Sequence, residues 1–535
     1  GHVPYEDFVY SSKYLEGALL TYLRRKGLVA PNKPADRREK MEALKANKQE
    51  KFIGAYVKAP IVGKYDWIYD LDLTSLYPSI IMTLNISPES KIGRIQDWDV
   101  QKYLNNEVDT YYIDDDTITK ENLKEYLDKS KFSVASNGVL YRTDQVGCIP
   151  GILDLWFTKR VEYKDEMKKY GKAGDKEKYA FFHKRQLVQK ILLNSLYGVL
   201  GLPAFRFYDV DNATAVTTTG QTVIKSTADM ANIKYNKELG NPDLDSNIYI
   251  DTDSVFFSAV PLMDKRFPNW KDEEQVVIAG YVDDIAGEMQ DYLNDFYDIM
   301  SEKIFNVDKD KHRLEIKKEY VAKAGLWIAK KRYAQWIISD NGVPCDKLDV
   351  KGLDVKRSSF PKAFQECMGK VLIDILRGVS EEELTKYVLD FKKDMENRPN
   401  SEIAKNTAVK NLKKYMPKGK RVPFTTMKGT PAHVKAAIAY NDLITHFKVP
   451  YKYGPMVNGD KVKWVYLKDN PLGLDGLAFT GYNDPPEIEK FIETYIDRNK
   501  IFERELRFKL QDFYDAIGWG EMISEQKTAE KFFTF

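Results

Sequence analysis

The sequence predicts an α+β fold in which helices pack against an antiparallel sheet. Strand-like residues on both sides of a short acidic tip at 248–257 are typical of a β-hairpin. Two long helical segments, 152–170 and 176–199, and an acidic amphipathic segment, 272–310, supply the helices. At 535 residues the chain is too long for one compact core, so we expect several subdomains.

The composition narrows the possible chemistry. Formal net charge is only +2, so a nucleic-acid site would have to consist of local basic patches. The sequence shows no apolar run of about 18 residues and no signal-peptide pattern. Cys148, Cys345 and Cys367 are scattered without a CxxC pair, which argues against a disulfide framework and a cysteine-rich metal module. We therefore expect carboxylates, lysines, arginines and tyrosines to carry the function.

The N-terminal part contains a helix and a connector before the first strand. The dipeptide Gly1-His2 is expected to be a vector remnant, and the apolar spacing of residues 5–26 predicts a helix that Gly27 ends. Residues 30–50 form a polar, charged connector. Residues 52–56 are then expected to open the first strand.

A first carboxylate follows the next strand. Residues 67–69 predict a strand that delivers Asp72 to its end, and residues 75–81 are expected to leave it through a turn containing Pro78. Residues 92–131 are interpreted as an insertion, to which the sequence assigns no function.

The two long helical segments predict an antiparallel helix hairpin. A tight turn at 171–174 would join them into a rod about 30 Å long. Arg160 and Lys164 share one helix face and could face Lys190 across the hairpin. Three converging cations suit a triphosphate. The alternative is a solvated helix face, which is the expected role of the lysines near the tip.

The second helix also carries a polar face. Lys190, Asn194 and Tyr197 stand at i, i+4 and i+7, and Gly198 would let another group approach the backbone closely. After this hairpin, residues 205–233 predict mixed strand and helix character.

The acidic hairpin tip contains Asp251 and Asp253, which share one strand face at most about 7 Å apart. Two carboxylates so close repel each other unless a proton or a divalent cation lies between them. The alternative is an Asp-Thr-Asp turn without chemistry.

The C-terminal half is basic in places. A short strand at 325–329 ends in Lys330, Lys331, Arg332 and Tyr333, for which a solvated strand end is the alternative. Residues 401–435 carry nine lysines and arginines against one acid, a surface that suits duplex phosphates and predicts salt-sensitive binding. The aromatic C-terminus is either packed down or a docking peptide.

Three stretches, in this order, resemble the A, B and C motifs of family B DNA polymerases. They are DxxSLYPS from Asp72, KxxxNSxYG from Lys190 and YxDTDS from Tyr249. The segments NISPES, NATAVTTTGQ and KKRYA resemble the T-even-type bacteriophage branch, and the resemblance runs from about Phe52 to the C-terminus. It implies a right-hand polymerase with a palm of antiparallel sheet plus helices, two-helix fingers and a mixed thumb.

The resemblance also implies domain boundaries and a reaction. The expected order is an N-terminal remnant and connector (1–51), palm (52–146), fingers (147–203), palm (204–355) and thumb with a clamp-binding tail (356–535). The expected reaction is template-directed addition of deoxynucleotides to a primer 3′ end by two-metal phosphoryl transfer, in the cytoplasm of an infected bacterial host and without a membrane partner.

The resemblance assigns roles residue by residue. Asp72 and Asp253 would bridge two Mg²⁺ ions with the Leu73 carbonyl as a further ligand, and Asp251 would tune the site. Tyr77 would exclude a ribose 2′-hydroxyl. The nucleotide-binding set is Ser75, Leu76, Tyr77, Arg160, Lys164, Lys190, Asn194, Tyr197 and Gly198. The DNA-binding set is Gly54 and Ala55 for the template, although Phe52 departs from the family's YxG(G/A) segment, and Lys330, Lys331 and Tyr333 for the primer. Phe532, Phe533 and Phe535 would bind a sliding clamp.

Only 71 residues precede Asp72, too few for the proofreading exonuclease that this family usually carries. We therefore expect either a chain shortened to the polymerase half or a separate exonuclease polypeptide. Two alternative functions remain. A two-metal nuclease would explain the acids but not Tyr77 or the basic helix hairpin. A catalytically silent DNA-binding scaffold would not need Asp72, Asp251 and Asp253 to be intact.

Overall fold

The computed structural model describes residues 4–7, 10–32, 53–417 and 422–522. The chain divides into two compact units, which are treated separately below. The first unit comprises Gly1–Ala59 and Tyr69–Val321, and the second comprises Pro60–Ile68 and Ala322–Phe535. No helix within the described ranges is long and apolar enough to cross a membrane.

Helices combine with a six-stranded sheet whose strand order is β11-β10-β9-β1-β8-β7. The two hairpins of this sheet, β7–β8 and β10–β11, are antiparallel, in agreement with the predicted α+β class. The strands are β1 (Gly63–Leu73), β7 (Asn247–Asp251), β8 (Ser254–Ser258), β9 (Ile316–Ala329), β10 (Arg332–Asp340) and β11 (Val343–Lys351). Strands β1 and β9 contribute residues to both units.

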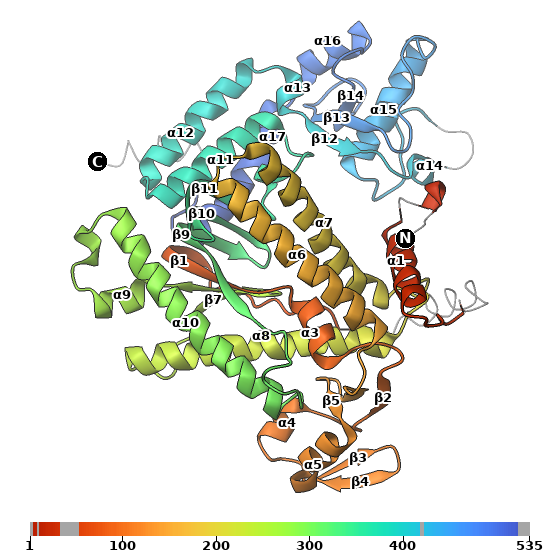
Figure 1. The fold of residues 1–535 in the computed structure, drawn as a ribbon. Helices are drawn as coiled ribbons and strands as arrows, with labels where there is room; N and C mark the ends of the chain where they lie inside the picture. Colours follow the sequence, from red (N-terminus) through yellow and green to blue (C-terminus); the bar gives the residue numbers. More distant parts are fainter. Residues whose placement is uncertain (1–3, 8–9, 33–52, 418–421, 523–535) are drawn as a thin grey trace. The chain divides into compact units, whose positions relative to one another are not determined.

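In the first unit, two long antiparallel helices, α6 (Cys148–Lys172) and α7 (Lys176–Leu200), confirm the predicted helix hairpin (Figure 1). Gly174 at the turn between them has φ 73°, a conformation that glycine adopts at little cost. The other helices are α1 (Ser11–Arg25), α3 (Leu76–Leu84), α8 (Val210–Leu239), α9 (Val260–Arg266) and α10 (Gln275–Lys303), with 3₁₀ turns at Tyr5–Asp7 and Trp270–Asp272.

Three local predictions for this unit are wrong. Residues 205–233 do not mix strand and helix, because Asp209 caps one continuous helix, α8, by accepting from the Asp211 and Asn212 amides. Pro78 does not lie in an irregular turn but in the first turn of α3, where its missing N–H costs no helical bond. Residues 53–56 form no strand, and β1 is the first strand.

Residues 92–131, interpreted as an insertion, form part of a small subdomain with its own core, which extends from Lys91 to Arg142. Its buried side chains include Ile95, Tyr111, Leu123 and Leu140. Its elements are β2 (Lys91–Arg94), α4 (Val100–Leu104), β3 (Thr110–Ile113), β4 (Asp116–Thr119), α5 (Lys120–Ser130), β5 (Phe132–Val134) and β6 (Val139–Arg142).

The second unit packs helices around one large apolar core and a three-stranded sheet, β12-β13-β14. Its helices are α11 (Lys362–Arg377), α12 (Glu381–Asp394), α13 (Asn400–Ile403), α14 (Leu412–Tyr415), α15 (Ala432–His446), α16 (Pro486–Tyr495), α17 (Arg498–Phe502) and α18 (Phe508–Ala516). Short 3₁₀ turns lie at Asp354–Lys356 and Met395–Asn397, and a π-helical turn at Glu503–Arg507 joins α17 to α18. The strands are β12 (Lys405–Ala408), β13 (Lys461–Tyr466) and β14 (Gly476–Phe479).

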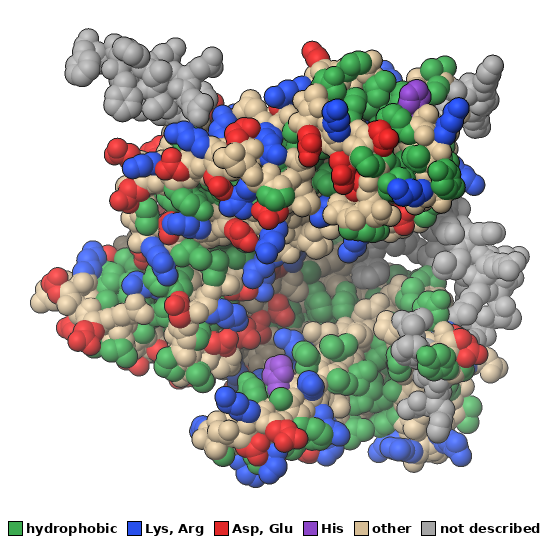
Figure 2. Space-filling view, turned by 90° about the horizontal axis from the view of Figure 1, so that it is seen from above, with side chains coloured by type: hydrophobic (Ala, Val, Ile, Leu, Met, Phe, Trp, Pro, Cys, Tyr) green, Lys and Arg blue, Asp and Glu red, His purple; other side chains and the backbone are tan. Residues whose placement is uncertain are grey.

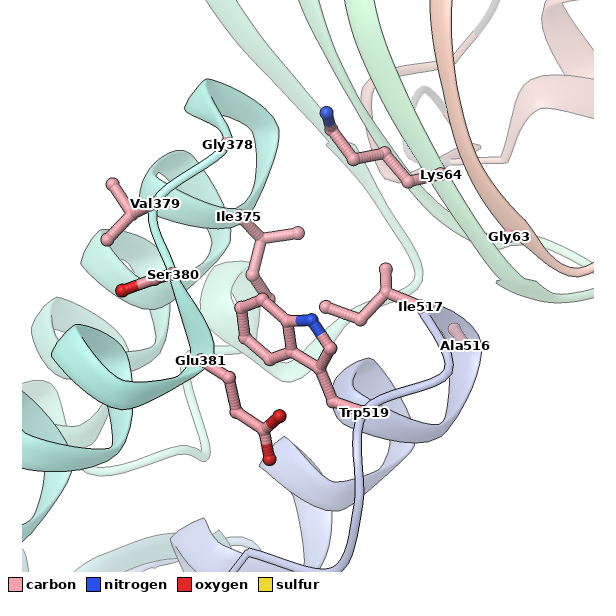
Figure 3. A pocket seen from close by; sticks show the side chains of 10 residues that line it. All are labelled: Gly63, Lys64, Ile375, Gly378, Val379, Ser380, Glu381, Ala516, Ile517 and Trp519. Carbon is pink, nitrogen blue, oxygen red and sulfur yellow. The ribbon is translucent and has the colours of Figure 1, made fainter.

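A cavity of about 690 Å³ opens in the second unit, beside the C-terminal end of α18. The Trp519 indole lies near Ile375 and Ile517, and Glu381 and Lys64 lie at the rim of the cavity (Figure 3). None of the ten described residues that line it is a predicted site residue.

Candidate active site

The end of β1 and the tip of the β7–β8 hairpin bring two carboxylates together in the first unit. Residues 67–71 of β1 are buried, and this anchors the strand that ends just after Asp72. The Ser254 hydroxyl lies 2.9 Å from Asp72 Oδ2, to which it donates, and the Leu73 amide donates to the Asp253 carbonyl at 2.8 Å. Asp72, near the end of β1, therefore lies beside Asp253, in the turn that precedes the neighbouring strand β8.

The hairpin tip has an unusual backbone. Thr252, between the two acids, has φ 70°, a left-handed conformation that a β-branched residue rarely adopts. The Asp253 amide donates to the Asp251 carbonyl at 2.8 Å, which closes the turn tightly. The predicted hairpin with acids at its tip is confirmed.

The two acids are electrostatically unfavourable neighbours. Burial, followed by repulsion from Asp253 and Glu319, raises the pKa of Asp72. Burial also raises the pKa of Asp253, with Asp251 and Glu319 contributing in the same direction. A divalent cation would relieve this repulsion, and carboxylate and carbonyl oxygens are the donors that Mg²⁺ prefers. The residues present thus fit such an ion.

The protein side chains do not enclose the ion on their own. Within the described part of the chain, no three histidine, cysteine, aspartate or glutamate side chains are arranged to hold one metal ion. Mg²⁺ commonly uses only one or two carboxylates and takes its remaining oxygens from water and substrate phosphates.

Glu319 is a site residue that the sequence reasoning missed. It lies on β9, next to β1 in the sheet, and its charge acts on Asp72, Asp253 and Arg160. Asp70 is a second missed acid. It is 1% exposed on the same face of β1 as Asp72, and burial, followed by Asp72, raises its pKa well above the usual range. The strand pattern could have indicated Asp70, but only the sheet order brings Glu319 to the site.

Cations from the helix hairpin face these acids. Arg160 on α6 donates from Nη1 to the Ser75 hydroxyl at 2.9 Å, while its Nε is buried without a hydrogen-bond partner among the described residues. Burial lowers the pKa of Arg160 and, with help from Arg160 itself, that of Lys164. Lys190 on α7 acts electrostatically on both Asp72 and Asp253. The structure therefore brings the three predicted cations to one region, as expected for an anionic ligand.

An aromatic pair lies beside the cations. The Tyr77 and Tyr197 rings have centroids 4.3 Å apart, and burial raises the pKa of both hydroxyls. A Cβ on Gly220 of α8 would lie 3.0 Å from the Tyr77 ring, so glycine permits this ring position. Asn194 and Gly198 are exposed on α7, whereas Leu76 is buried in α3 and contributes packing.

The predicted template residues lie close to the hairpin tip. Gly54 and Ala55 are exposed, and the Gly54 carbonyl accepts from Gln221 Nε2 at 2.7 Å. The Thr252 amide donates to the Tyr56 carbonyl at 3.2 Å. This segment therefore borders the acidic turn.

The predicted primer residues lie in the second unit, at the β9–β10 turn. Lys330 and Lys331 are exposed, and Lys331 has φ 59°. Tyr333 is only 3% exposed and stacks on Trp327 with ring centroids 5.8 Å apart. The two lysines thus lie at the surface of the turn, while the Tyr333 ring supports the hairpin from within.

The remaining predictions concern basic surfaces and the aromatic C-terminus. Lysines and arginines are interspersed with acids over the face seen in Figure 2, in keeping with the low net charge. Phe532, Phe533 and Phe535 lie outside the described residues.

Comparison with known proteins identifies the family. The sequence profile of DNA polymerase family B matches residues 9–266 and 284–502. The DNA-directed DNA polymerase of Enterobacteria phage T4 is 27% identical over 90% of this chain and 57% of its own length, and that of Escherichia phage RB69 is 26% identical over 86% and 55%. A DNA polymerase of Thermococcus gorgonarius is 28% identical over 76% of this chain and 42% of its own. The chain thus spans little more than half the length of the two phage relatives. With a profile match over most of its length, the chain belongs to the DNA polymerase family B.

Proposed function

We propose that this chain adds deoxynucleotides to a primer 3′ end under the direction of a template strand. The observation that carries the proposal is the meeting of Asp72 and Asp253 opposite Arg160 and Lys190. A divalent cation would offset the repulsion between the partly buried acids, and the basic side chains opposite them would attract phosphates. A triphosphate bound with its metal satisfies both requirements.

The acids would hold the metal ions. Asp72 and Asp253, with the Leu73 carbonyl, are the proposed ligands of two Mg²⁺ ions, and Asp251 and Glu319 shape the field around them. When bound, such ions lower the pKa of a primer hydroxyl and offset negative charge on a leaving pyrophosphate. Ser254 keeps Asp72 oriented through its hydroxyl.

The helix hairpin would hold the nucleotide. Arg160, Lys164 and Lys190 neutralise the phosphates, and Ser75 orients the Arg160 guanidinium. Asn194 and Gly198 lie on the exposed face of α7, beside Tyr197. Movement of this hairpin over a correctly paired nucleotide would complete the site and exclude water.

Tyr77 would select the sugar. Its ring is fixed by Tyr197 and by the space above Gly220, so a ribose 2′-hydroxyl would meet a side chain that cannot easily move aside. In this proposal the α7 face, Tyr77 and the acids belong to palm and fingers, and the second unit supplies the thumb and the primer contacts of Lys330 and Lys331.

The proposed partners are primer–template DNA, deoxynucleotides and a sliding clamp bound by the C-terminal phenylalanines. The DNA polymerase names of the two phage relatives support the DNA and the deoxynucleotides as partners. The sliding clamp rests on the resemblance of the motifs alone.

Single-nucleotide incorporation tests the function. The purified chain is incubated with Mg²⁺ and four primer–templates that differ only in the first template base. We expect the complementary deoxynucleotide to be added in each case. Addition independent of the template base, or shortening of the primer that Asp72→Asn and Asp253→Asn abolish, would replace this proposal by a terminal transferase or a nuclease.

A further inference from the structure

A short segment, Gly54–Lys58, lies along the free edge of the catalytic hairpin. We call it the edge segment. Strand β7 ends the six-stranded sheet, and the edge segment pairs antiparallel with it through a bridge between Val57 and Asp251. The Lys58 amide donates to the Ile250 carbonyl at 3.2 Å, and the Thr252 amide donates to the Tyr56 carbonyl at 3.2 Å. The edge segment thus covers backbone groups that a sheet edge would otherwise leave open.

One of these bonds reaches the catalytic turn itself. Thr252 lies between Asp251 and Asp253 in a left-handed conformation, which is strained for a β-branched residue. A strained conformation persists only where its surroundings hold it. The Tyr56 carbonyl is the acceptor that holds the Thr252 amide, so the shape of the acidic turn depends on the position of the edge segment.

Lys58 fixes the end of the edge segment next to this bond. Its Nζ lies 2.6 Å from Asp245 Oδ2, 2.5 Å from the Asn247 carbonyl and 3.3 Å from Asn247 Oδ1. All three ammonium protons therefore have acceptors. Asn247 is fully buried, and loss of the ammonium would leave its two oxygens without this donor.

The other end is held by α8. Gln221 donates to the Gly54 carbonyl, and the Lys225 ammonium lies 4.7 Å from the centre of the Tyr56 ring. These contacts act on the start and the middle of the segment. At the junction of the segment with β7, the side-chain contact is the ion pair of Lys58 with Asp245. The Lys58 side chain is 20% exposed.

We infer that Lys58 is a positioning residue for the catalytic site: it locks the edge segment against β7, and the edge segment in turn holds the Asp251-Thr252-Asp253 turn in its metal-binding shape. The inference rests on the proposed function for its catalytic consequence, whereas its structural consequence can be measured without catalysis. It also joins the segment proposed to meet the template to the acids that perform the chemistry.

Hydrogen exchange of the metal-free, DNA-free chain tests the structural step. Lys58→Met keeps the length of the side chain and removes the ammonium. We expect amide exchange in the peptide covering residues 250–254 to become about tenfold faster, while exchange in α10 stays unchanged. The matched control is Lys237→Met, which removes an exposed lysine near the end of α8 and should leave the turn unaffected.

A second variant and a kinetic readout complete the test. Asp245→Asn should loosen the same peptide, and the double variant should be no worse than Lys58→Met alone, because the two side chains act through one contact. In single-nucleotide incorporation, Lys58→Met should raise the Mg²⁺ concentration for half-maximal rate by about tenfold and leave KM for the nucleotide unchanged.

Three results would overturn the inference. They are unchanged exchange at residues 250–254, faster exchange spread equally over the whole first unit, and additive effects of the two substitutions. An inactive parent chain would instead overturn the proposed function, and the exchange measurements would still decide the role of Lys58.

Discussion

The β7–β8 and β9–β10 hairpins use the same backbone device for opposite charges. Each turn contains a non-glycine residue in the left-handed conformation, Thr252 at φ 70° in the first and Lys331 at φ 59° in the second. The first turn is flanked by partly buried acids, whereas the second presents exposed lysines. A partly buried pair of like charges is stabilised by a counter-ion at the site, while exposed cations are hydrated and exchange their partners readily. The comparison therefore predicts a chemical role for the first turn and a binding role for the second.

The two turns are also held differently. The Thr252 amide is held by a carbonyl from the edge segment. The Lys331 turn is held by close packing: a Cβ on Gly352 would lie 1.8 Å from the Lys331 carbonyl oxygen. In both cases a residue distant in sequence fixes the tip. A substitution at that distant residue can therefore change the shape of the tip while its charged side chains stay the same.

The largest expected effect comes from the acids. Asp72→Asn and Asp253→Asn should each slow nucleotide incorporation by more than about 1,000-fold, roughly 4 kcal/mol of barrier, because a metal ligand is lost. Primer–template affinity, measured by fluorescence anisotropy, should stay within about threefold of the parent. A rate within tenfold of the parent would remove the acids from the chemistry.

The next effect comes from the basic turn. Lys331→Met should weaken primer–template binding about tenfold, leave the rate at saturating DNA nearly unchanged, and lower the slope of log affinity against log salt by about 1. Lys309→Met removes an exposed lysine from the first unit and serves as the control. Equal losses in the two variants would mean that only total charge matters.

A smaller effect should follow from the packing beneath that turn. Gly352→Ala must displace the Lys331 backbone, so we expect primer–template binding several-fold weaker than in the parent. Gly342→Ala is matched, since Gly342 also has positive φ at 76°, but beyond its chain neighbours no atom of the described residues lies within 4 Å of its Cβ position. It should lose about 1 kcal/mol of stability and no DNA affinity. Indistinguishable binding by the two variants would show that the position of Lys331 is unimportant.

The sequence predicted the elements that carry the acids, because local patterns define these elements. A strand leading to Asp72, a hairpin around Asp251 and Asp253, and a helix face with Lys190 each follow from short-range patterns, and the motifs supply their order. Glu319 and Lys58 could not be predicted in this way, because their roles depend on which strand neighbours which. The sequence did not predict the long helix α8, because its threonines favour strands locally. The Asp209 cap and the burial of one helix face stabilise the helix instead.

The fold of the second unit was predicted only in outline. The basic stretch 401–435 was recognised as interrupted, but its short elements, α13, β12 and α14, are fixed by a core assembled from residues across the whole unit. Tyr333 illustrates the limit. The motif suggested a DNA contact, while burial against Trp327 is a tertiary property that no short pattern contains.

The proposed function requires that Asp72 and Asp253 form a pair that binds a divalent cation. Thermal unfolding with and without Mg²⁺ tests this requirement most directly. Both carboxyls have raised pKa values in the folded chain, so without metal the folded state binds more protons than the unfolded state, and stability falls as pH rises above about 4. Mg²⁺ competes with those protons. We therefore predict that saturating Mg²⁺ raises Tm by several degrees at pH 8 and by less at pH 6, and that Asp72→Asn and Asp253→Asn abolish most of the gain. A gain that is the same in the parent and in both variants would contradict the account.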